Sequence, residues 1–469
     1  MLGLFGTLNL GARSLSTQQQ GTEIAGQNLA NVNNPAYARQ RLALQTSISI
    51  PSPVGPQGTG VESVAIVQIR SYWLDQQIQS ETSVTGSLNA QQIALQTIQA
   101  NLGEQIDTQA TTSDSTGSQK GLSQGLSNLF NAFQSVSLDP SSLSERQVLI
   151  QTAQGLTSQF NQLSNRLDTV GASLDQSVQS DVGQSNQLLA DIAKLNQQII
   201  YSEASSGGVA NDLRDSRQAK IESLSKLVNI TTADQPNGGL DVSIGGVTMV
   251  SGVSQLDSLE TYDAGGGQIL VRAQTAGTPL TLTGGSIQGT IDVRDGALAD
   301  LKNSTNNLAA QLISQVNSIY SAGYDLNGAT GQNFFIGTDA ATIGVNPDLL
   351  DDPSKFQASD AAGEAGNNAT VLALAQLANG KIAALNNQTF SQSYSTSVAK
   401  LGQTIANVND QVDNHTVVSN MLSSQRDSIS GVSIDEEMTD LMKYQKAFEA
   451  SARLITVVSD MLDTVVNMK

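Results

Sequence analysis

The side chains that most often carry catalysis are scarce in this sequence. Its 469 residues include no Cys and a single His, His415. Thiol catalysis, disulfides and Cys-ligated metal are therefore excluded. A single His also nearly excludes a His-based catalytic triad and a metal site with several His ligands. We interpret His415, in the run Asp413-Asn414-His415, as a solvated helix residue.

Three further patterns also have simpler explanations. Asp435-Glu436-Glu437 could supply paired carboxylates, but acids at a helix start are better explained by the helix dipole. Asp325-Leu326-Asn327-Gly328 lacks the spacing of a calcium loop and predicts a turn, and Gly265-Gly266-Gly267 lacks the Lys of a phosphate loop. We therefore expect no catalytic residue, no cofactor and no metal, and we predict that the protein is not an enzyme.

Composition predicts a folded, acidic protein. Hydrophobic residues make up 39% and charged residues 14%, and the net charge is −19. Such a surface repels phosphate backbones and anionic lipid, so we expect neither a nucleic-acid nor a membrane partner. The opening Met1–Gly6 has no preceding basic residue, and no run approaches the ~18 apolar residues of a membrane span. The sequence predicts a cytosolic protein, or one exported without a cleaved signal peptide.

The N-terminal segment predicts a helix with a weak heptad seam. Small and apolar residues recur from residue 8 to 32 with alternating three- and four-residue spacing. Asn34-Pro35 ends the pattern, because a proline disfavours helix at the preceding residue. The seam consists of Leu8, Gly11, Leu15, Gln18, Thr22, Ala25, Leu29 and Val32.

The middle of the chain changes from helical to β-like patterns and back. Helical patterns fill about 87–205, with a break at Asp139-Pro140. Leu240–Ile244, Gly245-Gly246 and Val247–Val250 predict a hairpin, since a type I′ turn needs positive φ at both central residues. The sequence also predicts a strand at Val61–Ile69, strands at Ile269–Ala273 and Leu280–Thr283, a β-rich unit up to Gly296, and helix from Ala297.

The last helix has two apolar stripes. Gly431 is a plausible stop for the preceding helix, and Ser433-Ile434-Asp435-Glu436 has the spacing of a capping box. A helix that is apolar on two stripes needs more than one partner, so we expect it to become ordered on assembly. The first seam is Met438, Leu441, Gln445, Phe448, Ala452, Ile455, Ser459, Leu462 and Val466, and the second stripe is Leu454, Val458, Met461, Val465 and Met468.

Motifs at both ends resemble those of flagellar rod, hook and hook-associated proteins. Asn28-Leu29-Ala30-Asn31, Pro35-Ala36-Tyr37 and Arg39-Gln40 resemble the family's N-terminal signature. Ala36 stands where the family usually has Gly, so that turn must avoid positive φ or be strained. The C-terminal signature residues are Gly431, Val432, Asp435, Glu436 and Glu437.

Interior motifs resemble the FlgK type of hook-associated protein within that family. They are Leu129–Phe133 with Arg146-Gln147, Asn211–Arg217, and Tyr324–Gly328 with Phe334-Phe335. The resemblance implies a mainly α multidomain protein with an inserted all-β domain. It would have a coiled-coil inner domain of the terminal helices (1–40 with 431–469), a helical-bundle middle domain (41–230 with 297–430) and a small β outer domain (231–296).

The resemblance implies a structural role at the junction between the bacterial flagellar hook and filament, reached by type III export. Expected partners are further copies of the chain, the hook protein, a second junction protein of the FlgL type and a cytosolic export chaperone of the FlgN type. The chaperone would cover the stripe from Leu454 to Met468. Another axial protein, either the hook protein or the second junction protein, remains an alternative, and a flagellum-associated hydrolase is a remote one.

Overall fold

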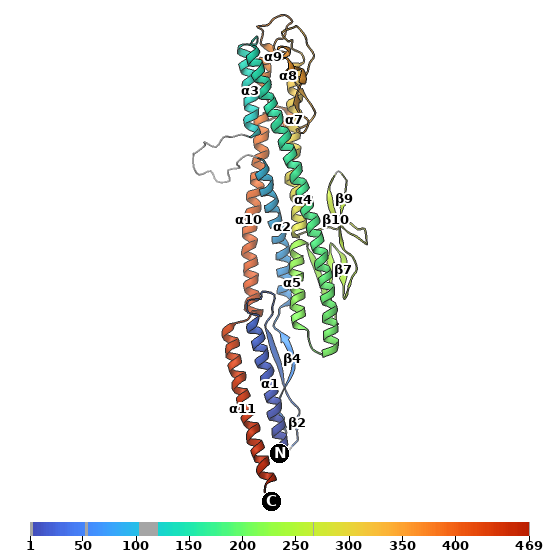
Figure 1. The fold of residues 1–469 in the computed structure, drawn as a ribbon, viewed down its shortest axis with the longest axis vertical. Coiled ribbons are helices and arrows are strands. Elements are labelled where there is room, and N and C mark those ends of the chain that lie inside the picture. The colour runs from blue at the N-terminus through green and yellow to red at the C-terminus, as the bar shows by residue number, and fades with distance from the viewer. Residues whose placement is uncertain (1–2, 52–54, 103–120, 266, 469) are drawn as a thin grey trace.

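The computed structural model describes residues 3–51, 55–102, 121–265 and 267–468. The molecule is long and mainly helical, and both termini lie at the same end (Figure 1). The helices are α1 Leu4–Ala30, α2 Tyr72–Leu102, α3 Leu122–Leu138, α4 Leu143–Ser206, α5 Asn211–Leu227, α6 Gly285–Val293, α7 Ala299–Tyr320, α8 Pro347–Asp351, α9 Ala369–Gln376, α10 Phe390–Ser430 and α11 Ile434–Val466.

The strands are short and antiparallel. They are β1 Gln40–Thr46, β2 Ser49–Ile50, β3 Gln57–Gly58, β4 Val61–Gln68, β5 Ile230–Asp234, β6 Leu240–Ile244, β7 Val247–Ser251, β8 Ser254–Gln255, β9 Leu259–Asp263, β10 Ile269–Ala273, β11 Phe335–Ile336 and β12 Gly344–Val345. The largest described sheet has the order β5-β6-β7-β8, and β1 pairs with β4. Strand β4 matches the predicted strand, whereas its partner β1 was not predicted.

The terminal helices α1 and α11 form an antiparallel pair. Ser14 Oγ lies 2.9 Å from Ser451 Oγ, and Asn28 Nδ2 donates to Glu437 at 3.1 Å, so each step along α1 matches one step back along α11. A Cβ on Gly21 would lie only 2.5 Å from the Tyr444 ring. Small residues on α1 therefore let the two helices approach closely.

The seam of α11 differs from the predicted one by one residue at every second position. Glu437, Ser451 and Val458 are buried and Tyr444 faces Gly21, whereas Met438 is 44% exposed. The shared positions Leu441, Ile455 and Leu462 are half-buried, and Phe448 and Val466 are exposed. The prediction was wrong because the buried face of this helix uses polar and small side chains, which a search for apolar residues passes over.

The predicted seam of α1 is only partly buried. Gly11 and Ala25 are buried as expected, but Leu8, Leu15, Leu29 and Val32 are half-buried, and Val32 lies beyond the last helical residue. The other buried residues are Thr17, Gly21, Ile24 and Asn28. Ile24 belongs to a second face of α1, which packs against the β1–β4 hairpin.

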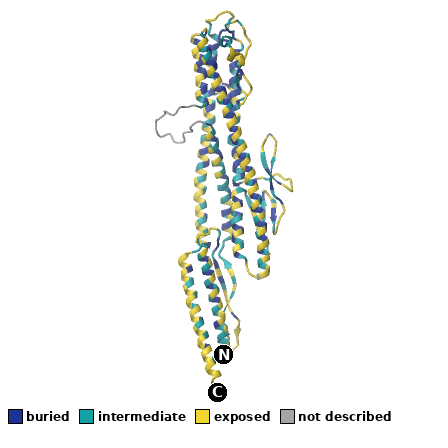
Figure 2. Ribbon diagram, in the orientation of Figure 1, coloured by how far each residue is buried: buried dark blue, intermediate teal, exposed yellow. Residues whose placement is uncertain are grey.

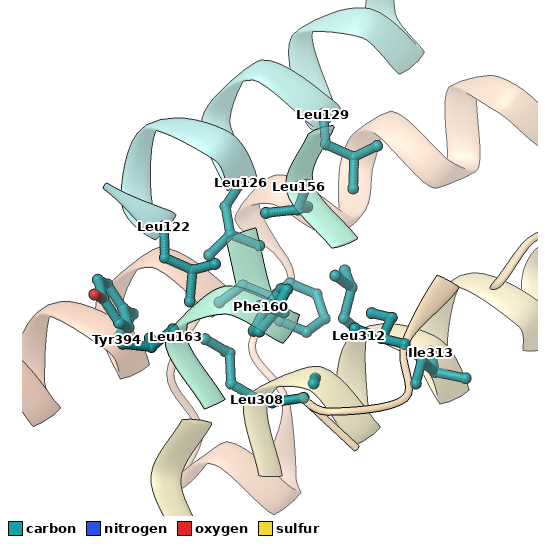
Figure 3. Packing of buried hydrophobic residues seen from close by; sticks show 14 of the residues in the cluster. Leu122, Leu126, Leu129, Leu156, Phe160, Leu163, Leu308, Leu312, Ile313 and Tyr394 are labelled. Atoms are coloured by element: carbon teal, nitrogen blue, oxygen red, sulfur yellow. The ribbon is translucent and has the colours of Figure 1, made fainter. Parts of the chain in front are cut away.

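The helical body is built around a long hydrophobic core, and a second core lies where α4, α5 and α6 pack against the β-rich region. Figure 3 shows leucines from α3, α4 and α7 converging on Phe160 of α4. Helix α10 runs antiparallel to α2 along the body, as the contacts Glu81–His415 and Gln92–Asn409 show. The core continues to the far end, where Phe334 contacts Phe133, Tyr320 and Phe356. This body carries the terminal pair at its opposite end (Figure 1).

The β-rich region lies beside the long helix α4 (Figure 1). The predicted Gly245-Gly246 turn is confirmed, with φ of 54° and 84° and Ile244 paired with Val247. Leu280–Thr283 was predicted as a strand but forms none, and residues 285–293 are helical rather than β. The glycines there suggested turns, whereas Gly289 serves close packing: a Cβ would lie 2.2 Å from the Ser87 carbonyl oxygen of α2.

Replacing Gly21 with Val should loosen the terminal pair. The added side chain would collide with Tyr444, and overpacking of this kind costs about 1–3 kcal/mol. Gly26→Val is the matched control, because nothing lies within 4 Å of a Cβ at Gly26 in the same helix. Hydrogen exchange of the α11 amides should accelerate roughly tenfold or more in Gly21→Val. Equal acceleration in both variants would contradict the close approach at Gly21.

Candidate functional site: a polar joint between the terminal helices and the body

The signature residues of the two ends meet in one buried polar cluster, which we call the polar joint. Asn28, near the end of α1, lies at its centre and is 1% exposed. Its Nδ2 donates to the Gln40 carbonyl at 2.9 Å and to Glu437 Oε2 at 3.1 Å. Its Oδ1 accepts from Tyr37 Oη at 2.8 Å and from the Gln40 amide at 3.0 Å. One amide therefore ties α1, the following turn, β1 and α11 together.

Arg39 connects the same turn to the first turns of α11. Its guanidinium pairs with Glu436 and, at 2.6 Å, with Glu437, and it lies 3.8 Å from Asp440. Its backbone amide donates to the Ser430 carbonyl at 2.8 Å, where α10 ends. Glu437 is buried, so this acid does more than complement the helix dipole, which was the sequence-based interpretation. The Ser433 side chain caps α11 by accepting from the Glu436 amide, which is half of the predicted capping box. The Glu436 side chain pairs with Arg39 instead of completing the box.

A second arginine anchors the joint in the body. Arg70, just after β4, pairs with Asp75 of α2 at 2.9 Å and with Asp215 of α5 at 3.0 Å. Asp215 Oδ2 also accepts from the Ala38 amide at 3.3 Å. Gln40 Nε2 donates to Asp212 of α5 at 2.8 Å. Helix α5 thus presents two carboxylates to the segment that enters from the terminal pair.

The opposite side of α5 is held by its own arginines. Arg214 pairs with Glu203 of α4 at 2.8 Å. Arg217 donates to Asn196 Oδ1 and to the Gly238 carbonyl, each at 2.8 Å. Both kinds of charged residue in the block Asn211–Arg217 therefore have a structural role. Its acids face the joint, and its arginines face α4 and the β-rich region. Sequence reasoning found this block as a family motif but did not assign Asp75, Asp212 or Asp215 to a site.

Burial controls the ionisation of the joint. It raises the pKa of Tyr37 far above the ordinary value, with Asp212 and Asp215 adding to the shift, so the hydroxyl remains a donor to Asn28. Burial also raises the pKa of Asp215 to about 6, against the lowering effect of Arg70. The pKa of Asp75 is raised by burial as well. The joint therefore contains a carboxyl group, that of Asp215, with a pKa of about 6.

The turn between α1 and β1, which leads into the joint, is unstrained. Ala36 has a negative φ, so the turn avoids the conformation that would need Gly. Asn31 Nδ2 donates to the Gln27 carbonyl and Pro35 is exposed. Gly431 ends α10 with φ of −72°, and a Cβ there would lie 2.3 Å from the Asp427 carbonyl. Gly431 is thus required by close packing and not by a left-handed turn.

The other residues whose types could take part in catalysis or metal binding have structural roles. His415 is not simply solvated, which corrects our interpretation: its Nδ1 lies 2.7 Å from Glu81 Oε1 of α2. Gly121-Leu122-Ser123-Gln124-Gly125 has the Gly-x-Ser-x-Gly spacing of a hydrolase nucleophile, but it spans the first turn of α3 and the only His of the chain pairs elsewhere. Asp325 closes a turn by accepting from the Asn327 and Ala329 amides.

Within the described ranges, no cluster of three or more His, Asp or Glu is arranged to hold a metal ion. None of the described helices combines the length and apolar character needed to cross a membrane.

One face of α11 carries apolar side chains that the described chain covers only at its edge, where Leu454 borders Gly11 of α1. Leu454, Met461, Val465 and Met468 of the predicted second stripe are exposed, but Val458 is buried against α1. Val457, 49% exposed, takes its place in the outer stripe. Figure 2 shows how much of α11 is exposed compared with the body helices. We call Leu454, Val457, Met461, Val465 and Met468 the outer stripe.

Comparisons with known proteins agree with this architecture. Residues 113–335 match the family model "Flagellar hook-associated protein FlgK helical domain", and residues 420–468 match "Flagellar basal body rod FlgEFG protein C-terminal". The chain is 27% identical over 515 residues to flagellar hook-associated protein 1 of Bacillus subtilis, covering 100% of this chain and 99% of the relative. It is 22% identical to that of Escherichia coli, covering 98% and 99%.

A solved structure shares the fold. The flagellar hook junction protein FlgK from Burkholderia pseudomallei aligns with a TM-score of 0.63 and 16% identity, covering 76% of this chain and 100% of that one. The class is therefore a mainly helical, multidomain protein with a small β part. Over nearly its whole length, the chain is similar to flagellar hook-associated proteins of the FlgK type.

Replacing Asn28 with Leu should weaken the joint strongly. The substitution keeps the branched shape of the side chain but leaves buried groups of Tyr37, Gln40 and Glu437 without their partner. Each unsatisfied buried group costs about 1–3 kcal/mol. We expect limited proteolysis of the folded chain to become faster near residues 31–36, which separates α1 from the body. Asn31→Leu, on the half-buried side of the same turn, is the control and should change the cleavage rate little.

Asp215 should make stability depend on pH. Its folded pKa of about 6 lies above the unfolded value of 3.8, so its contribution to stability is fully present below about pH 4 and is lost as pH rises through 6. A shift of this size corresponds to about 3 kcal/mol. Denaturant unfolding at pH 4.5 and 7 should show a smaller difference in Asp215→Asn than in the unchanged chain, and exposed Asp463→Asn should leave the difference intact. An unaltered difference in Asp215→Asn would refute the buried titration.

Proposed function

We propose that the chain is a structural subunit of the junction between the flagellar hook and filament. The observation that carries this proposal is the outer stripe of α11. Within the described chain, α11 packs extensively only against α1, which leaves a continuous apolar face at the end where both termini lie. Monomeric soluble proteins rarely leave such a face uncovered, and it fits a helix that is completed by neighbours.

We propose that the three parts of the fold have separate roles. The terminal pair (1–40 with 431–469) makes the assembly contacts, and the middle domain (41–230 with 297–430) forms the rigid body. The region 231–296, whose last residues are helical, is the outer domain. The polar joint supports this division, because it holds the terminal pair in one orientation through hydrogen bonds and ion pairs.

The proposal includes a route to the assembly site. The subunit is exported unfolded through the flagellar type III channel, and it adds to the hook beside other copies of itself. Before export a cytosolic chaperone of the FlgN type covers the outer stripe, and after assembly a second junction protein of the FlgL type follows. The family likeness and the exposed stripe support these partners.

Deletion of the gene tests the role in the cell. We expect electron microscopy to show bare hooks, with flagellin lost to the medium. Absent hooks would mean a rod or hook component, and normal filaments would contradict the assembly role. Complementation with the unchanged sequence should restore filaments, which controls for effects on neighbouring genes.

The outer stripe is tested by Met461→Glu with Val465→Glu in the complementing copy. Two charges on this face should abolish filament formation, because burying an unpaired carboxylate is strongly unfavourable. Leu138→Glu with Val253→Glu is the matched control, since these exposed apolar residues lie on the body and the β region. Variant protein found in the medium would mark a failure of assembly, and variant protein kept in the cytoplasm would mark a failure of export. Normal filaments would refute the role of the stripe.

A further inference from the structure

A groove between α1 and the β1–β4 hairpin is a second uncovered surface on the terminal part, with an apolar floor and with Gln20, Gln27 and Ser63 also in its lining. The groove has a volume of about 340 Å³. Ile24 and Leu42 form its buried floor, and Val64 and Ile66, which are 58% and 40% exposed, form one wall. Glu23 of α1 lies at its rim. Leu44, Ile48 and Ile50 extend the exposed apolar surface along the hairpin.

The groove and the outer stripe lie on different sides of α1. Helix α1 packs against α11 on one face and against β1 and β4 on another, so it separates the two surfaces (Figure 1). A chain with two different complementary surfaces associates head to tail, and such contacts propagate from copy to copy. We propose that the hairpin groove of one copy receives the outer stripe of α11 from a second copy. This inference rests on the proposed function.

Charge complementarity supports this occupant. Glu23 at the groove rim has no ion pair in the described chain. Its Oε1 accepts a hydrogen bond from Gln19 Nε2 at 3.2 Å. Arg453 precedes Leu454 on the exposed part of α11 and has no ion pair among the described residues either. The neighbouring Lys446 already pairs with Glu449. Docking of the stripe in the groove would bring these two opposite charges together at the edge of an apolar contact.

The register of the terminal pair shows that the two surfaces of one chain cannot meet. Ser14 is beside Ser451 and Asn28 beside Glu437, so Val457 is level with Leu8. Leu8 is 16 residues before Ile24, or about 24 Å along the helix axis. Arg453 is similarly about 16 Å from the level of Glu23. An axial displacement of about 20 Å between copies therefore brings Val457 within one helical turn of the level of Ile24. It also brings Arg453 within one turn of the level of Glu23.

Cysteine cross-linking tests the contact, because the natural sequence contains no Cys. Val64→Cys and Val457→Cys are combined in one full-length chain, which complements the deletion strain, and the isolated flagella are oxidised. A disulfide needs Cα atoms within about 7 Å, so a bond within one chain is excluded. We expect a ladder of covalent oligomers on a denaturing gel from the double variant, and none from either single variant.

Different results separate this inference from the proposed function. Filaments that form without a ladder, with dimers from Val457→Cys alone, would mean that the outer stripe meets another α11 and would overturn the groove. Filaments without any cross-link would overturn it as well. Failure of the unchanged chain to restore filaments would instead overturn the proposed function.

Charge reversal gives a second measurement if the cysteine variants fail to assemble. Glu23→Arg and Arg453→Glu alone should each reduce the number of filaments per cell about tenfold, because each places like charges together. The two reversals combined should restore filaments. Glu23→Arg with Lys446→Glu is the control and should restore fewer. Loss of filaments in the combined variant, or no loss in either single variant, would overturn the proposal.

Discussion

The buried side-chain amide of Asn28 is the interaction on which the arrangement of this molecule depends. It satisfies four hydrogen bonds at the point where α1 ends, and the partners come from the following turn, from β1 and from α11. A buried amide left without these partners would be costly, so the surrounding backbone must hold one geometry. This constraint sets the direction in which both terminal helices leave the body.

The joint is polar and the seam beyond it is made of small residues, and the two features act together. Close approach at Gly11, Ser14 and Gly21 places α11 near enough for Glu437 to reach Asn28. Little large apolar area is buried between these helices, so their large apolar side chains remain outside. The resulting uncovered surfaces are the outer stripe and the hairpin groove. A terminal pair built this way is specific in geometry but incomplete in burial, which suits a subunit that gains its last contacts on assembly.

The joint also couples the terminal part to the body through charge. Arg39 and Arg70 each face several carboxylates, of which Glu437, Asp75 and Asp215 are buried, and α5 supplies acids that hold the entering segment. Buried ion pairs often add little net stability, because the cost of desolvation offsets their attraction. Asp215 illustrates the cost, since burial raises its pKa to about 6 despite the nearby Arg70.

Local patterns in the sequence were enough to predict most long helices, the Gly245-Gly246 hairpin and the Ser433 cap. Its composition alone showed that catalytic side chains are scarce. The order of its motifs was enough to indicate the family. Tertiary structure alone decided that Val458 is buried and Val457 exposed, because the α11 seam is chosen by the small residues of α1. It also decided that Asp75, Asp212 and Asp215 meet the terminal signature. These acids lie far from that signature in sequence, and no local pattern records a hydrogen bond between distant segments.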